Sequence, residues 1–139
     1  DQEGSVANIW SAIDDIGVER IDHGMNSLED PALMSELAAR QTGLTVCPIS
    51  NRFVVADSRS EDLKAMLDAH LAASVHSDDP AYFGGYMNAN LDAAANDAAM
   101  SVDEVVQLMR NAFSTSWAAP DVKARHLDAL DAYVAEAAP

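Results

Sequence analysis

Side chains that can bind a metal ion or exchange protons gather at three places in the sequence, each directly after a short apolar run. These places are Asp22-His23-Gly24, Cys47-Pro48-Ile49-Ser50-Asn51 and His76-Ser77-Asp78-Asp79-Pro80. Carboxylates, imidazoles and thiols are the groups that proteins use as metal ligands and as acid–base catalysts. The composition of the three places therefore predicts a metal site or an acid–base site.

The Asp78-Asp79 pair has two interpretations. In the first, it caps the turn or helix that follows, as Asp often does. In the second, one carboxylate binds a metal ion and the other contacts a substrate. Two adjacent anions repel each other, and a divalent cation relieves that repulsion. Taken alone, the sequence Asp-Asp-Pro favours the cap.

The other polar residues at the strand ends also fit more than one role. His23 fits a structural or a functional histidine, and the glycine after it at a strand end leaves both interpretations open. His76 fits a metal ligand or a residue of the pocket wall, and we favour the wall. We expect Cys47 to be a small buried residue, since no basic neighbour would activate its thiol. Asn51 either makes hydrogen bonds within the pocket or caps a turn, and we favour the cap. The aromatic loop 82–86 either covers a planar ligand or packs as a turn.

The elements that must position these residues alternate between apolar strands and helices. Strands are expected at 18–22, 44–47 and 72–76, with starts 26 and 28 residues apart. Helices are expected at 7–16, after Asp30-Pro31, from Ser60, and at 88–99, 101–116 and 119–138. Strands joined by helices are parallel, in a barrel or an open doubly wound sheet.

The carboxyl ends of parallel strands form one rim, where active sites of such folds are built. His23 and Asp78 lie 55 positions apart in the sequence. The strand periodicity nevertheless predicts that they face the same pocket. We expect residues 1–139 to form a single domain, because neither a linker nor a low-complexity segment interrupts the pattern.

Composition excludes several classes of partner. The chain has 139 residues, 49% of them hydrophobic, and a formal net charge of −15. This charge argues against nucleic acid and against an anionic membrane surface, and it leaves a small neutral or cationic ligand. The single cysteine excludes an internal disulfide and a zinc finger and fits a reducing cytoplasm. We expect neither a signal peptide nor a transmembrane helix.

Three motifs together resemble the adenosine/adenine deaminase family. They are residues 18–24 (Val-Glu-Arg-Ile-Asp-His-Gly), 45–51 (Thr-Val-Cys-Pro-Ile-Ser-Asn) and 77–86 (Ser-Asp-Asp-Pro-Ala-Tyr-Phe-Gly-Gly-Tyr), in the family's order and spacing. The resemblance implies a (β/α)8 TIM barrel, which needs ~250 residues. Residues 1–139 then look like its C-terminal part: the last helix of the fifth unit, units six to eight, and terminal helices.

The resemblance also implies a reaction. Family members use one Zn²⁺ per complete site to hydrolyse adenine or adenosine to hypoxanthine or inosine plus ammonia, and loop 77–86 looks more like the adenine branch. Asp78 resembles the carboxylate zinc ligand. Asp79 resembles the residue that contacts purine N7, and His23 resembles the histidine that orients the attacking hydroxide.

The chain departs from the family pattern at its start. The family's His-x-His pair and the histidine of its His-Ala-Gly-Glu motif are absent, and the proton-shuttling glutamate would fall at Gln2 or Glu3. One carboxylate does not hold catalytic zinc. We therefore expect the isolated chain to be inactive, to need the missing N-terminal half-barrel, and to self-associate. The alternative from another class is a non-catalytic acidic interaction or scaffold domain, a remnant of the barrel.

Overall fold

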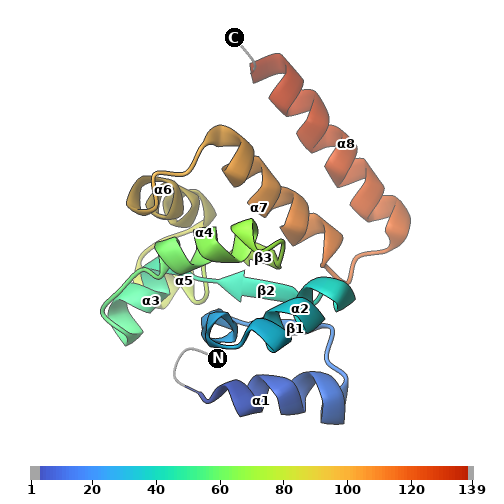
Figure 1. The fold of residues 1–139 in the computed structure, drawn as a ribbon. Helices are drawn as coiled ribbons and strands as arrows, with labels where there is room; N and C mark the ends of the chain where they lie inside the picture. Colours follow the sequence, from blue (N-terminus) through green and yellow to red (C-terminus); the bar gives the residue numbers. More distant parts are fainter. Residues whose placement is uncertain (1–3, 138–139) are drawn as a thin grey trace.

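Three short parallel strands occupy the centre of the computed structural model, which describes residues 4–137 (Figure 1). They are β1 (Arg20–Asp22), β2 (Gly43–Val46) and β3 (Ala72–Val75), in the order β1-β2-β3. Asp22 pairs with Thr45, and Thr45 pairs with Ser74. The three strands therefore end at the same edge of the sheet.

Helical crossovers join the strands. Between β1 and β2 lie a 3-10 helix, η2 (Met25–Glu29), and α2 (Pro31–Arg40), which Asp30 caps by accepting hydrogen bonds from Ala32 N and Leu33 N. Between β2 and β3 lie α3 (Pro48–Val54) and α4 (Ser60–Asp68). The crossovers force the parallel pairing, because a tight turn would reverse the chain direction.

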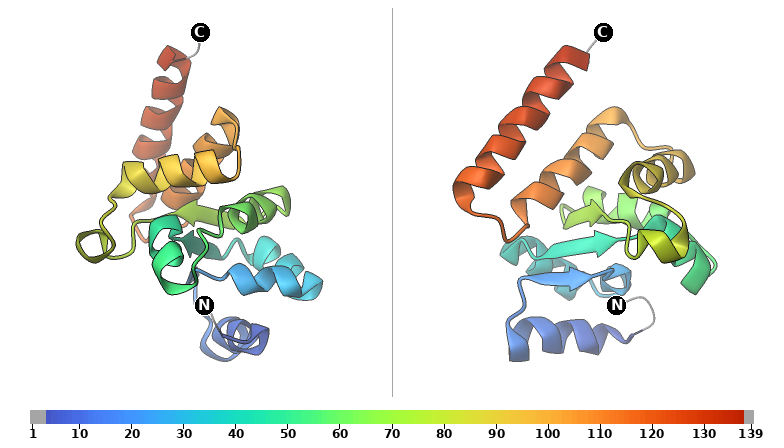
Figure 2. Two further views of the ribbon diagram at one scale, coloured as in Figure 1. Left: turned by 90° about the vertical axis from the view of Figure 1, so that its left-hand side faces the viewer. Right: turned by 180° about the vertical axis from the view of Figure 1, so that it is seen from behind.

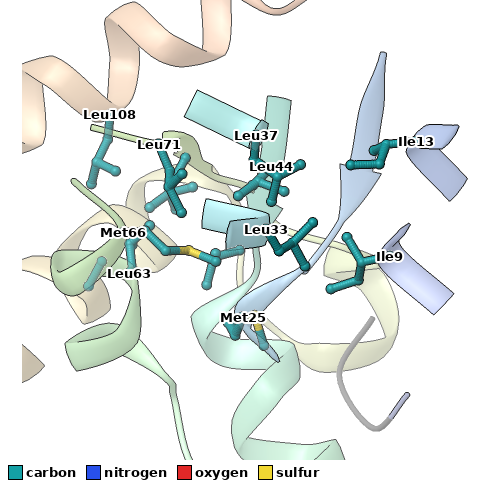
Figure 3. Close-up of a cluster of buried hydrophobic side chains, with 14 residues drawn as sticks. Ile9, Ile13, Met25, Leu33, Leu37, Leu44, Leu63, Met66, Leu71 and Leu108 are labelled. Atoms are coloured by element: carbon teal, nitrogen blue, oxygen red, sulfur yellow. The ribbon is translucent and has the colours of Figure 1, made fainter. Parts of the chain in front are cut away.

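Side chains alternate across the sheet, so its two faces differ in character. One face contributes apolar residues to the core, including Leu44, Val46 and Val75, which are at most 1% exposed. Buried residues of the surrounding helices pack against it, as Figure 3 shows for Leu33, Leu37, Leu63, Met66 and Leu108. The other face carries mainly polar residues at alternate positions: Arg20, Asp22, Thr45, Cys47, Ser74 and His76.

The flanking helices complete the core. At the N-terminal side, α1 (Val6–Ser11) continues into a π-helix, η1 (Ala12–Ile16), and these two elements bury Ile9 and Ile13. At the C-terminal side lie α5 (Pro80–Phe83), α6 (Met87–Asp97), α7 (Val102–Ser114) and α8 (Pro120–Ala137). Helix α7 packs on β3, and α8 lies beyond α7, away from the sheet (Figure 2). In residues 4–137 no helix is long and apolar enough to cross a membrane.

The structure confirms the α/β class and the three expected strands, each displaced by two residues or fewer at its start. The helix expected at 101–116 begins with Ser101 and Glu104 in a reciprocal capping arrangement. Two helices were not expected. Pro48, which follows the expected strand 44–47, opens α3, and Pro80 opens α5 inside the Asp-Asp-Pro segment. Proline suits the first position of a helix because it lacks the amide hydrogen that this position leaves unpaired.

The free edges of the sheet generate the first prediction. β1 and β3 are the outer strands of the described sheet, and the exposed edges of such strands tend to pair with other chains. One edge carbonyl of β3, Ala73 O, already accepts a hydrogen bond from Asn111 Nδ2 at 2.7 Å. We expect the isolated 139-residue chain to form dimers or larger species in light scattering. A single monomeric species at high micromolar concentration would contradict this expectation.

Candidate functional site

The carboxyl ends of the three strands surround a cavity of about 260 Å³. β1 and the turn after it contribute Arg20, Asp22 and His23; β2 and its end contribute Thr45 and Cys47; the end of β3 contributes His76, Ser77 and Asp78. The prediction that His23 and Asp78 share a pocket is confirmed. The cavity is polar because it lies on the face of the sheet that does not join the apolar core.

Asp78 is fixed by a hydrogen bond from the neighbouring crossover. Ser50 Oγ, at the start of α3 and fully buried, donates to Asp78 Oδ2 over 2.6 Å. Hydrogen bonds to an ionised carboxylate are short and strong. A carboxylate has two oxygens, so this bond orients the group and leaves Oδ1 for another partner. Asp78 also has a left-handed backbone, with φ at 56°.

His23 lies in a tight turn after β1. Its backbone N–H continues the ladder by donating to Thr45 O at 2.9 Å, and its φ is 62°. Gly24 follows with φ at 79°, where an added Cβ would lie 2.8 Å from Leu44 Cδ2. Glycine is required at this position for both its backbone angle and its lack of a side chain.

The ring of His23 is hydrogen-bonded to the side chain of Asn51 in α3. Burial lowers the pKa of His23, and the nearby Asp78 and Asp22 carboxylates and Asn51 counter this in part. The net lowering favours the neutral imidazole at neutral pH. Asn51 Nδ2 donates to Ser58 O at 3.1 Å, which connects the histidine to the loop after α3.

Asp79 has a different position from Asp78. Its side chain caps α5 by accepting a hydrogen bond from Tyr82 N at 3.1 Å, and, like Asp78, it is exposed. Asp79 does not belong to the lining of the cavity described above. The capping interpretation thus describes this aspartate, while Asp78 faces His23 across the cavity.

His76 lines the wall of the cavity, as expected. Ser74 Oγ donates to Leu44 O at 3.0 Å, so its own lone pairs accept from His76 Nε2, also at 3.0 Å. This arrangement places the proton of the neutral ring on Nε2. Burial lowers the pKa of His76, and the positive charge of Arg20 adds to the effect.

Cys47 is the small buried residue that the sequence indicated. It is 4% exposed, and its thiol contacts Thr45 O at 3.7 Å. Burial, together with the negative charges of Asp78 and Asp22, raises the pKa of the thiol to about 12. A thiol with a raised pKa carries little thiolate near neutral pH, which argues against Cys47 as a nucleophile.

Two expectations about neighbouring residues need correction or refinement. Asn51 does not cap a turn but lies within α3, fully buried, and contacts His23. In the aromatic segment 82–86, Phe83 ends α5 with its ring 5.7 Å from the Phe53 ring, whereas Tyr82 and Tyr86 are 79% and 71% exposed. The expectation missed Ser50 as a partner of Asp78, although its place at a strand end marked it as a candidate.

The described residues do not by themselves form a metal site. Among residues 4–137, no group of three or more His, Cys, Asp or Glu side chains is placed to hold a metal ion. Catalytic zinc requires three protein ligands. The Asp78 carboxylate, oriented by Ser50, suits the role of one ligand, and further ligands would have to come from outside these residues. Gln2 and Glu3, the alternatives for the proton shuttle, lie outside the described residues.

These features place the protein among α/β proteins whose polar site lies at the carboxyl ends of parallel strands. The chain belongs to the adenosine deaminase family, whose family model matches residues 2–133. It is 52% identical to the adenine deaminase of Sphingopyxis alaskensis over 134 residues, which is 95% of this chain and 39% of that protein. It is 47% identical to the adenine deaminase of Hahella chejuensis, over 96% of this chain and 40% of that protein.

Two solved structures have the same fold as this chain. The crystal structure of adenine deaminase from Arthrobacter aurescens superposes with a TM-score of 0.89 at 40% identity, covering 96% of this chain and 41% of that one. A zinc-bound amidohydrolase from Burkholderia ambifaria shares the fold, with a TM-score of 0.76 at 23% identity. The chain therefore spans about 40% of the length of the relatives that it matches.

The environment of Cys47 leads to the second prediction. We expect iodoacetamide at pH 8 to alkylate Cys47 in the folded protein about 100-fold or more slowly than in guanidinium, because the folded thiol stays protonated and covered. A rate equal to that of the unfolded chain would contradict this assignment.

The same thiol affects stability at alkaline pH. Its folded pKa of about 12 exceeds that of an unfolded cysteine, near 8.5, so the folded state binds more protons in between. The contribution of Cys47 to folding stability should therefore fall as pH rises from about 8.5 towards 12. The Cys47→Ser variant is the matched control and should lack this part of the decline in denaturation experiments.

Proposed function

We propose that this chain provides part of the active site of a zinc-dependent purine aminohydrolase, which hydrolyses adenine to hypoxanthine and ammonia. The observation that carries the proposal is the placement of His23 and Asp78 on one cavity, each held by a neighbouring residue of α3. The relatives named adenine deaminase, at 42–52% identity, support the substrate class.

We further propose that β1, β2 and β3 are the last three strands of a (β/α)8 barrel. The parallel order, the helical crossovers and the polar rim fit such an assembly. Residues 1–139 would then comprise the last helix of the fifth unit, units six to eight and the terminal helices. In the complete barrel the free edges of β1 and β3 would pair with strands of the remaining part.

Each candidate residue has a separate role in the proposal. Asp78 would be the carboxylate ligand of the zinc ion, which, when bound, lowers the pKa of a water molecule. His23, a neutral imidazole hydrogen-bonded to Asn51, would orient the attacking hydroxide. Asp79, just outside the cavity lining, would contact purine N7 with its carboxyl group. Gln2 or Glu3 would occupy the proton-shuttle position, and of the two only Glu3 could transfer a proton.

Adenine is favoured over adenosine because loop 77–86 resembles the adenine branch and because the relatives carry that name. The alternative of a non-catalytic scaffold finds no specific support in the cavity, since a scaffold would not need an oriented carboxylate beside a neutral histidine. Reading the residues encoded upstream of Asp1 would separate the two. A His-x-His pair and a His-Ala sequence there would restore the full ligand set.

The third prediction tests the activity itself. We expect the complete zinc-loaded protein to release ammonia from adenine with kcat/KM at least about 10-fold above that for adenosine, which corresponds to ~1.4 kcal/mol of discrimination. We expect the isolated 139-residue chain to release none, since residues 4–137 do not supply the three ligands that catalytic zinc requires. Zinc-dependent ammonia release by the isolated chain, or none by the complete protein, would overturn the proposal.

The fourth prediction tests the roles of the carboxylates in the complete protein. Asp78→Asn should abolish zinc binding, measured by metal content, together with activity. Ser50→Ala should reduce zinc affinity or kcat by about 10–100-fold, because the carboxylate loses the group that orients it. Asp79→Asn should lower kcat/KM by about 10–100-fold while zinc content stays at the wild-type level.

Ser35→Ala is the matched control for Ser50→Ala. Ser35 Oγ donates to Pro31 O on the exposed side of α2, so its removal should leave zinc content and kinetics unchanged. A Ser50→Ala variant that behaves like Ser35→Ala would argue against Asp78 as a ligand that Ser50 orients.

A further inference from the structure

Asn90 lies in α6, is fully buried, and makes three side-chain hydrogen bonds, one to the backbone of α3 and two to the loop that leads into α6. We propose that Asn90 is a positioning residue of the active site, which fixes α3 and the loop after Asp79 in one arrangement. It does not line the cavity and would act through the residues that it holds. This inference rests on the function proposed above.

The first contact fixes the start of α3. Asn90 Oδ1 accepts a hydrogen bond from Ile49 N at 3.0 Å. The first amides of a helix lack intrahelical partners, and among the described residues Cys47, at the N-cap of α3, provides no side-chain acceptor. Asn90 therefore supplies from α6 the cap that α3 lacks in its own sequence.

The position of α3 matters because the two residues after Ile49 contact the site. Ser50 donates to Asp78, and Asn51 is hydrogen-bonded to His23. Asp78 and His23 follow different strands. The position and rotation of α3, which contacts both, therefore set the distance between them. A cap at the first turn of a seven-residue helix fixes that position.

The second pair of contacts fixes the loop after Asp79. Asn90 Nδ2 donates to Gly85 O and to Tyr86 O, both at 3.1 Å. The two amide hydrogens and one lone pair of the oxygen are thus all in use. Gly85 is buried against Ile49, and an added Cβ would overlap Ile49 Cδ1. The loop is therefore pressed directly on the residue whose amide Asn90 caps.

Together these contacts form a clamp, defined here as Asn90 with Ile49 N, Gly85 O and Tyr86 O. One side of the clamp governs Asp78 and His23 through α3, and the other governs Asp79 through α5 and its following loop. Reacting groups displaced by about 1 Å can lose about 100-fold in rate. The clamp thus fixes the position of Asp78 and His23, the proposed zinc and hydroxide groups, relative to Asp79, the proposed purine contact.

The fifth prediction uses two variants of the complete zinc-loaded protein with a control. Asn90→Ala removes all three bonds and should lower kcat and raise KM for adenine, with kcat/KM falling about 10–100-fold. Asn90→Asp keeps an acceptor for Ile49 N but places an oxygen against two carbonyls, so it should mainly raise KM. Asn88→Ala, an exposed residue of the same helix, should stay within about twofold of wild type.

The kinetic pattern distinguishes positioning from simple structural support. A residue that only stabilises the fold would lower Tm and leave kcat and KM unchanged at temperatures well below Tm. Folded Asn90→Ala with wild-type kcat/KM would overturn the proposal. The proposal would be supported if Asn90→Ala changed both kcat and KM while Asn90→Asp changed mainly KM.

Amide hydrogen exchange on the wild-type complete protein tests the clamp without any variant. The Ile49 amide should exchange slowly despite its place in the first helical turn, because Asn90 Oδ1 accepts its hydrogen. Rapid exchange of Ile49 would overturn the clamp even if both variants fail to fold. If the wild type showed slow exchange but no adenine deamination, the proposed function would fail while the clamp stood.

Discussion

Parallel pairing of β1, β2 and β3 is the constraint on which the rest of the structure depends. The register places Asp22, Thr45 and Ser74 in one row across the sheet, and Thr45 Oγ1 donates to Asp22 Oδ1 at 2.9 Å. Helical crossovers cover one face of the sheet with apolar side chains. Polar residues are therefore directed to the other face, and the strand ends bring groups 55 positions apart onto one cavity.

Helix α3 also positions the residues of the cavity. Through two consecutive residues it contacts a carboxylate after β3 and a histidine after β1. Both contacts are hydrogen bonds made by buried side chains whose remaining polar atoms also have to be satisfied inside the protein. Such networks lose much of their value when one member is removed, because the other groups stay buried without a partner. The geometry of the site is thus distributed over the helix as well as the strands.

Some of this arrangement follows from the sequence, and some does not. The spacing of apolar runs gave the three strands, their parallel order and the shared cavity of His23 and Asp78, since each depends on local periodicity. The sequence pattern did not predict helices α3 and α5, because seven and four residues are too few to display a 3.6-residue period. The roles of Asp78 and Asp79 required the family resemblance, because two adjacent carboxylates look alike in sequence. The bonds Ser50–Asp78 and Ile49–Asn90 join residues 28 and 41 positions apart, and periodicity does not specify such pairs.

The left-handed backbone at His23 and Asp78 has an evolutionary consequence. Non-glycine residues pay about 1–2 kcal/mol to adopt this conformation, so glycine at either position would relieve strain while removing the side chain. Stability therefore favours glycine at these two positions, whereas the proposed reaction requires the histidine and aspartate side chains. In a lineage released from selection for the reaction, drift should carry them towards glycine sooner than it erodes the apolar core. The residues found at these two positions in any descendant would then record whether its cavity is still in use.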